Sequence, residues 1–102
     1  MSEYTFYSDP SHAWLAVPIK EVIECGAEVS RFSYVCTKRC MAYLEEDLDA
    51  YRFLKAKGFV IDGDGEYQIE GCKFNESHSN SSSWIRRLPR FSEKLTGYPH
   101  LT

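Results

Sequence analysis

Two short helical patterns, each followed by a glycine, constrain the fold of this chain more than any other feature. The first covers residues 18–25, where the proline suits a first helical position, and Gly26 follows as the C-cap. The second covers residues 47–57, with acids at its start, lysines near its end and Gly58 after it. Each pattern places its apolar residues on one face, so both helices are expected to pack against a sheet.

The other apolar and β-rich segments are expected to form strands. A turn at residues 8–11 separates the first two segments, and a polar loop at 37–39 joins the next two as a hairpin. A turn at 62–65 joins another pair, which residues 72–74 extend. The short connections favour an α+β fold, a small antiparallel sheet of four to six strands with two short helices packed on one face. The expected strands are residues 4–7, 12–17, 31–36, 40–44, 59–61 and 66–70.

The last third of the chain carries weaker structural signals. Residues 75–83 are entirely polar and include five serines, so they are expected to form a loop, with 77–83 as its Ser-rich part. Residues 84–88 fit one helical turn before a proline, and an irregular C-terminal tail is expected at 90–102. A length of 102 residues is typical of one domain, so residues 1–102 are expected to fold as a single domain.

Charge is divided unevenly along the chain. The net charge is −3, but residues 1–70 carry 13 acids and 7 bases, whereas residues 71–102 carry 2 acids and 5 bases. This balance excludes a generally basic nucleic-acid coat and, unless the charge is segregated, an acidic DNA mimic. The basic C-terminal segment either docks across the acidic part of its own fold, which we favour, or forms a separate contact surface for a partner.

The cellular compartment is predicted from what the N-terminal part lacks. Residues 1–4 have no apolar run typical of a secretory signal, and the apolar stretch 13–17 is far too short to span a bilayer. We therefore expect a cytoplasmic protein with no membrane partner. In that compartment the four cysteines are expected to be reduced thiols.

No motif indicates a bound metal or cofactor, and none is expected. Cys36 and Cys40 bracket a hairpin tip, and Cys72 and His78 are available as further zinc ligands, but their spacing supports no structural site. That set stays open as an alternative. The turn at 62–65 resembles a calcium loop, but a lysine stands where the twelfth position requires a glutamate.

His12 is the one histidine beside predicted structured elements, in a turn with Asp9 and Ser11. We expect it to stabilise that turn by hydrogen bonding to the backbone. A catalytic role would need a nucleophile and an orienting acid beside it, so a small hydrolase is the alternative. No catalytic residue is predicted, and no glycine loop for phosphate is present.

Two charged groups and several rings are the candidate binding residues. The acids at the start of the second helix could meet a basic partner surface, although stabilisation of the helix start already explains some of them. The arginines of the C-terminal segment, interleaved with aromatic rings, could bind phosphate groups or an acidic partner. The partner-binding candidates are Glu45, Glu46, Asp47, Asp49, Trp14 and Tyr43, and the phosphate or acidic-partner candidates are Trp84, Arg86, Arg87 and Arg90.

Aromatic residues make up 15% of the chain, which is more than the core of so small a domain hides comfortably. Surface Tyr and Trp side chains are effective anchors of interfaces. Tyr51 and Phe53 are assigned to the face of the second helix and Phe32, Tyr34 and Tyr43 to the predicted hairpin, which leaves Trp14, Trp84, Phe91 and Tyr98 without a firm place in the core. A contact surface is expected there first.

Three segments resemble a family of small proteins encoded by phages, prophages and other mobile elements. They are residues 8–17 (Ser-Asp-Pro-Ser-His-Ala-Trp-Leu-Ala-Val), 32–34 (Phe-Ser-Tyr) and 43–50 (Tyr-Leu-Glu-Glu-Asp-Leu-Asp-Ala), and residues 84–86 match a late Arg-Ile-Arg element loosely. Two turn glycines and a cysteine of the family pattern are replaced in this chain by Ser11, Ala13 and Leu48.

The resemblance implies a setting and no particular activity. Accessory proteins of mobile elements often bind and disable a host protein, and anti-CRISPR and other anti-defence proteins are typically of this size. We therefore expect a phage-type accessory protein of the bacterial cytoplasm, a monomer or homodimer that inhibits a host protein or defence complex by occlusion and is not an enzyme. The first alternative is a small nucleic-acid-binding module that uses the C-terminal arginine cluster. The second is a small hydrolase or metal enzyme around His12.

Overall fold

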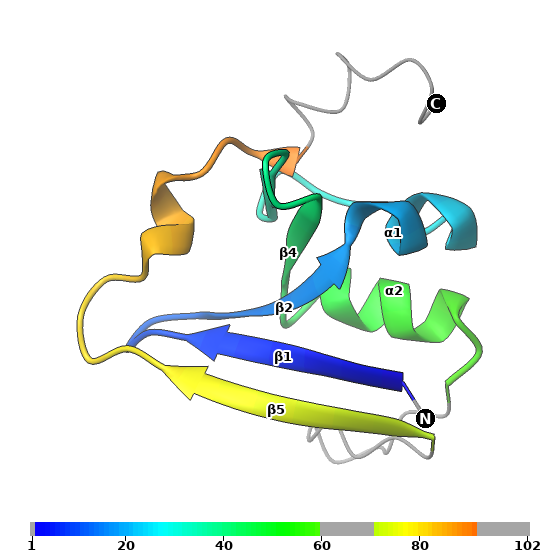
Figure 1. Ribbon diagram of the computed structural model, residues 1–102, viewed down its shortest axis with the longest axis horizontal. Coiled ribbons are helices and arrows are strands. Elements are labelled where there is room, and N and C mark those ends of the chain that lie inside the picture. The colour runs from blue at the N-terminus through cyan, green and yellow to red at the C-terminus, as the bar shows by residue number, and fades with distance from the viewer. Residues whose placement is uncertain (1, 60–70, 92–102) are drawn as a thin grey trace.

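The computed structural model describes residues 2–59 and 71–91 of the chain. Its elements are β1 (Ser2–Ser8), β2 (Ala13–Pro18), α1 (Ile19–Cys25), β3 (Tyr34–Cys36), β4 (Met41–Glu45), α2 (Asp49–Ala56), β5 (Cys72–His78) and the 3₁₀ helix η1 (Trp84–Arg87). The strands form a five-stranded sheet in the order β3-β4-β2-β1-β5 (Figure 1). The predicted α+β class, with a small sheet and two short helices, is confirmed.

Two hairpins form the first part of the sheet. β1 pairs antiparallel with β2 across the turn at 9–12, and β3 pairs antiparallel with β4 across the turn at 37–40. In the second turn Cys40 has a positive φ of 56°. Because β2 also pairs with β4, the two hairpins lie side by side in one sheet. The hairpin predicted from residues 31–36 and 40–44 is confirmed, with a shorter first strand.

The fifth strand differs from the prediction in two ways. β5 runs parallel to β1, beginning where the backbone N–H of Ser2 donates to the carbonyl of Gly71 at 3.0 Å, so the sheet is mixed. The prediction of an antiparallel sheet was wrong here because no tight turn joins β1 and β5, which lie far apart in the chain. The prediction of a loop from residue 75 was also wrong, because β5 reaches His78. β5 is an edge strand held by backbone hydrogen bonds, and polar residues provide these as well as apolar residues do.

The main core lies between the sheet and both helices. Side chains alternate along each strand, so every second residue of β2 and β4 points toward the helices. Figure 1 shows α1 and α2 on the same side of β4, as predicted. Phe53 and Leu54 of α2 and Val22 of α1 are almost completely buried in this core. The strands contribute Tyr4, Leu15, Val17, Val35, Ala42 and Leu44 to the same cluster.

A second core covers the opposite face of the sheet. It consists of Trp14, Ala16, Tyr34, Tyr43 and Ile85, the last from η1, which lies on the other side of β4 from the helices in Figure 1. The predicted helical turn at 84–88 is therefore confirmed as η1, and Ile85 is its fully buried residue. η1 ties the C-terminal segment to this face.

The chain after η1 continues along the edge of β3. The backbone N–H of Val35 donates to the carbonyl of Pro89 at 3.0 Å, and that of Phe91 donates to the carbonyl of Ser33 at 2.9 Å. Residue 90 is therefore not the start of an irregular tail, because it is paired with β3. The rest of the predicted tail with Tyr98, the predicted turn at 62–65 and most of its flanking strands lie outside the described residues.

No helix in the described part of the chain is both long and apolar enough to cross a membrane.

Candidate functional site

Five aromatic rings meet on the side of the sheet opposite the helices. The ring of Trp84 contacts Tyr43 at 5.1 Å and Tyr7 at 5.9 Å between ring centres, and both contacts are nearly perpendicular. Tyr7 also contacts Tyr43 at 6.1 Å, and Trp14 contacts Tyr34 at 6.1 Å. Perpendicular contacts of this kind are favourable because ring edges are positive and ring faces negative. The rings come from β1, β2, β3, β4 and η1, so four of the five strands contribute to the site.

Three guanidinium groups lie on these rings. The distances from guanidinium carbon to ring centre are 4.9 Å for Arg39 over Trp84, 5.2 Å for Arg86 over Trp14 and 4.6 Å for Arg90 over Tyr34. Cations within about 6 Å of a ring face are attracted by it. We call the five rings and these three arginines together the Arg–aromatic face.

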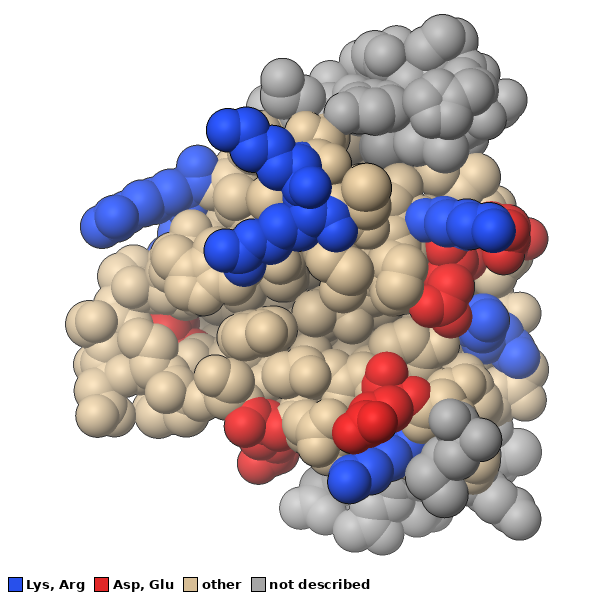
Figure 2. All heavy atoms as spheres, viewed as in Figure 1, with Lys and Arg blue, Asp and Glu red and all other residues tan. Residues whose placement is uncertain are grey.

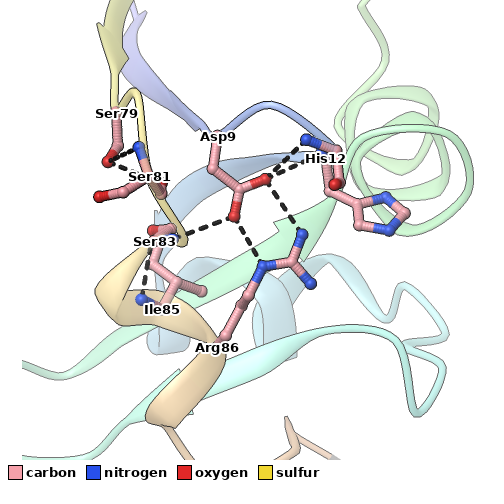
Figure 3. A network of polar contacts seen from close by, with 8 residues as sticks. Asp9, His12, Ser79, Ser81, Ser83, Ile85 and Arg86 are labelled. Carbon is pink, nitrogen blue, oxygen red and sulfur yellow. Dashed lines mark hydrogen bonds and ion pairs between the residues drawn. The ribbon is translucent and has the colours of Figure 1, made fainter.

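Arg86 is held by a buried acid at the turn between β1 and β2. Its Nε donates to Oδ2 of Asp9 at 2.6 Å and its Nη2 donates to Oδ1 at 3.0 Å (Figure 3). The backbone N–H groups of Ser11 and His12 also donate to Oδ1, and that of Ser83 donates to Oδ2, each at 3.0 Å. One carboxylate thus joins the turn to the start and the middle of η1.

This pairing fixes the charge state of both groups. The Arg86 guanidinium holds the pKa of Asp9 far below its usual range. Burial raises this pKa, but the three backbone N–H groups that donate to the carboxylate lower it further. The same pair raises the pKa of Arg86. The side chain of Asp9 is only 1% exposed, so Arg86 is committed to it. The charge of Arg86 is thus balanced within the fold, and its assignment as a phosphate-binding residue stays a prediction.

The same contacts fix the position of the C-terminal segment. Residues 83–91 dock on the chain's own fold, through Asp9 on one side and the edge of β3 on the other. This agrees with the favoured interpretation of the charge division. The acid involved belongs to the first turn, not to the acidic group that precedes α2.

Four cations in or next to the Arg–aromatic face have no acidic partner among the described residues. Five ion pairs join described residues, and none of them includes Lys38, Arg39, Arg87 or Arg90. Lys38, Arg39 and Arg87 are exposed. Figure 2 shows Lys and Arg atoms gathered at the upper left, on the side of η1 and the β3–β4 turn, whereas most Asp and Glu atoms lie low or at the right. This side of the molecule therefore carries an excess of positive charge although the whole chain is negative.

Only part of the aromatic cluster is open to a ligand. Trp84 is 38% exposed, whereas Trp14 is 2% and Tyr43 3% exposed. Burial raises the pKa of the Tyr43 hydroxyl, against the opposing effect of the nearby Arg39 guanidinium. Trp14 and Tyr43 thus lie buried in the cluster that η1 covers, and their assignment as partner-binding residues stays a prediction. Phe91, also expected near a contact surface, lies in the main core.

The predicted acidic group, which runs from the end of β4 to the first residue of α2, is mostly engaged within the fold. Asp49 is fully buried and accepts bonds from the backbone N–H and hydroxyl of Ser30 and from the hydroxyl of Ser33. Asp49 thus ties the loop before β3 to α2, and its assignment as a partner-binding residue stays a prediction. Glu45 accepts from the backbone N–H groups of Asp47 and Leu48. Asp47 remains exposed.

Glu46 lies between these acids and is half-buried. Burial raises the pKa of its carboxyl, and the neighbouring charges of Asp47 and Glu45 raise it further. Of the predicted acidic surface, Glu46 and Asp47 thus remain at least partly exposed.

The described residues hold no group of three or more His, Cys, Asp or Glu side chains placed to bind a metal ion. Cys36 and Cys40 lie at the β3–β4 turn, whereas Cys72 begins β5 and His78 ends it, where its Nδ1 is 2.9 Å from the hydroxyl of Ser8. His12 donates its backbone N–H to Asp9 and its exposed ring lies 6.2 Å from that of Trp14. His12 thus takes part in the turn through its main chain, whereas the predicted hydrogen bonding of its side chain to the backbone stays a prediction.

Sequence reasoning missed Tyr7, Lys38 and Arg39 as members of the site. The signal for the last two was visible, because the hairpin loop Thr37-Lys38-Arg39 is basic and polar between two apolar strands. Tyr7 carries no such signal, since its place in a strand gives no indication of which ring it meets across the sheet.

No family model, no curated protein and no solved structure matches the chain.

Proposed function

We propose that this chain is a non-enzymatic nucleic-acid-binding protein whose contact surface is the Arg–aromatic face. One observation carries the proposal: four cations without an acidic partner among the described residues lie on the two segments that meet at the exposed Trp84, the β3–β4 turn and residues 84–90, in a chain whose net charge is negative. They are Lys38, Arg39, Arg87 and Arg90. Cations that are not neutralised within the fold are what a phosphate backbone requires.

The proposal changes the first alternative drawn from the sequence. That alternative used Arg86, Arg87 and Arg90 of the C-terminal segment. Here Arg86 serves the fold, and the β3–β4 turn supplies Lys38 and Arg39 in its place. Arg90 is anchored through Nη1, which donates to the carbonyl of Arg31 at 2.9 Å. A surface assembled from two segments presents cations over a wider area than one segment does, which suits an extended polyanion.

Binding of this kind depends strongly on salt. Each neutralised phosphate releases counterions, so the logarithm of the affinity for a single strand falls with the logarithm of salt concentration by about 0.7 per phosphate. The proposal is tested by fluorescence anisotropy with labelled DNA and RNA strands of about 12 nucleotides, a length within the usual range of sites of this size. Wild-type protein is expected to bind at about 50 mM salt and to weaken steeply as salt is raised.

The variant Arg39→Ala with Arg87→Ala is expected to bind at least about tenfold more weakly at low salt. The slope of log affinity against log salt concentration is expected to be smaller by about 0.7 for each phosphate that is no longer neutralised. The matched control is Lys20→Ala with Lys55→Ala, which removes the same charge from exposed positions on α1 and α2. Its affinity and slope are expected to stay close to wild type. Absence of wild-type binding at low salt, or an equal weakening in the control variant, contradicts the proposal.

A second candidate keeps the role implied by the resemblance, a cytoplasmic phage-type accessory protein that blocks a host protein or defence complex. One observation supports a protein-binding surface: Phe32 is 49% and Tyr51 41% exposed, on the two segments that Ser30 and Asp49 join. Exposed rings, together with the exposed Asp47 in the segment before Tyr51, suit a basic protein partner.

This second candidate is tested in a bacterial host with an active defence system. Expression of the wild-type chain is expected to restore phage plating, and Phe32→Ser with Asp47→Lys is expected to abolish that effect. Arg39→Ala with Arg87→Ala serves as the comparison variant. Restored plating that is unaffected by Phe32→Ser with Asp47→Lys removes this candidate.

A further inference from the structure

We infer that the nucleic acid taken by this face is single-stranded, with one unpaired base stacked on Trp84. This inference rests on the proposed function and adds the class of ligand to it. It starts from the one ring of the Arg–aromatic face that is large, exposed and held in a fixed orientation.

The orientation of Trp84 is set before any ligand arrives. Its ring meets Tyr43 at an interplanar angle of 84° and Tyr7 at 77°. The residue begins η1, whose fully buried Ile85 and paired Arg86 anchor the turn next to that contact. A ring that is already ordered loses little conformational entropy on binding, which favours a stacked ligand.

Arg39 marks the face of the ring that accepts a planar group. Its guanidinium, itself flat, lies 4.9 Å from the ring centre, and its side chain is exposed. No described carboxylate holds it there. A base that stacks on Trp84 displaces this guanidinium toward the adjoining phosphate, where a charge-assisted bond replaces the contact with the ring.

A duplex does not fit the same geometry. Bases in a duplex are stacked on both faces, so a flat surface ring cannot reach them without unpairing. Reading of the major groove requires an element such as an α-helix to enter it. η1 has only four residues and is packed against the sheet through Ile85. A duplex therefore meets only the cations, whereas a single strand meets both the cations and the ring.

The chain supplies its own reporter for this step. It has two tryptophans, of which Trp14 is 2% exposed and Trp84 38% exposed. Quenching of tryptophan fluorescence by an added strand therefore reports on Trp84. The full chain is titrated with a thymidine strand, a uridine strand, a strand of equal length built of abasic sites, and the matching duplex.

The base-containing strands are expected to bind about tenfold or more tightly than the abasic strand at equal salt, because stacking of one base is worth that factor. They are also expected to quench tryptophan emission, whereas the abasic strand leaves it nearly unchanged. Trp84→Ala is expected to remove the difference between the two kinds of strand while keeping salt-dependent binding. Trp84→Tyr is expected to retain most of the difference, since it keeps an aromatic ring.

The failures of the two proposals are distinguishable. Equal affinity for the abasic and base-containing strands overturns this inference and leaves the proposed function standing. Tighter binding of the duplex than of the single strand also overturns the inference. Absence of binding to every polymer overturns both. If Trp84→Ala unfolds, the wild-type comparison of abasic and base-containing strands decides the matter alone.

Discussion

Asp9→Asn is expected to lower the free energy of unfolding by about 3 kcal/mol, because it breaks the pair that fastens η1 to the first turn. The carboxylate is 1% exposed and accepts two bonds from Arg86. An asparagine of the same shape has one acceptor oxygen and turns its amide donors toward the donors of the arginine. Arg86 is 31% exposed and regains some water, which places the effect at the lower end for a buried pair. Urea unfolding measures the change.

The control for this substitution is Glu3→Gln, the same acid-to-amide change in an exposed ion pair. Glu3 is 58% exposed and its partner Lys73 is 62% exposed, at 3.9 Å. Such pairs contribute little, so the expected change is under about 0.5 kcal/mol. Equal stability losses in the two variants contradict the account of Asp9.

The effect of Asp9→Asn on stability is expected to depend on pH, because folding shifts the pKa of Asp9. The pKa of Asp9 is lowered by folding, so the folded chain keeps the carboxylate charged where the unfolded chain protonates it. Its contribution is therefore complete above about pH 4, the ordinary value for aspartate, and is lost progressively below it. The stability difference between wild type and Asp9→Asn is expected to narrow as the pH falls below about 4. A difference that is constant between neutral and acid pH excludes the ion pair as its source.

Asp49→Ala is expected to cost about 2–3 kcal/mol, because three buried or half-buried donors lose their acceptor at once. They are the backbone N–H and the hydroxyl of Ser30, at 3.0 Å and 2.7 Å, and the hydroxyl of Ser33. Ser33 in turn accepts from the backbone N–H of Glu45 at 2.9 Å, so the network joins β4 to the loop before β3. The change in unfolding free energy is measured by urea unfolding, from the midpoint and from the dependence of that free energy on urea concentration.

Asp47→Ala is the matched control for Asp49→Ala. It removes the same charge two positions earlier, from an exposed side chain. The expected change in unfolding free energy is within about 0.5 kcal/mol. A loss at Asp47 as large as that at Asp49 shows that the charge of this segment, and not the buried network, stabilises the fold.

Local signals in the sequence predicted most helices and strands, but they did not predict which distant strands pair with one another. The glycines after both helices and the polar loop at 37–39 predicted α1, α2 and the β3–β4 hairpin, because helix ends and tight turns are decided by neighbouring residues. The parallel pairing of β1 with β5 depends on residues far apart in the chain. No periodicity within either strand indicates such a partner.

The candidate site shows the same division between local and long-range information. The basic and aromatic character of the C-terminal segment was visible, but which of its arginines the fold itself uses was not. That distinction depends on Asp9, which meets Arg86 across 77 positions of sequence. Asp49 was expected on a surface because its neighbours are acidic, yet two serines of a distant loop hold it inside the fold.

An NMR titration of isotope-labelled protein with a thymidine strand of about 12 nucleotides tests most directly whether the Arg–aromatic face is the contact surface. The account predicts that the largest changes occur at the backbone amides of Lys38, Arg39 and Arg87 and at the indole N–H of Trp84, and that they diminish as salt is raised. Changes confined to Phe32, the acidic residues before α2 and α2 itself, or no changes at low salt, contradict it.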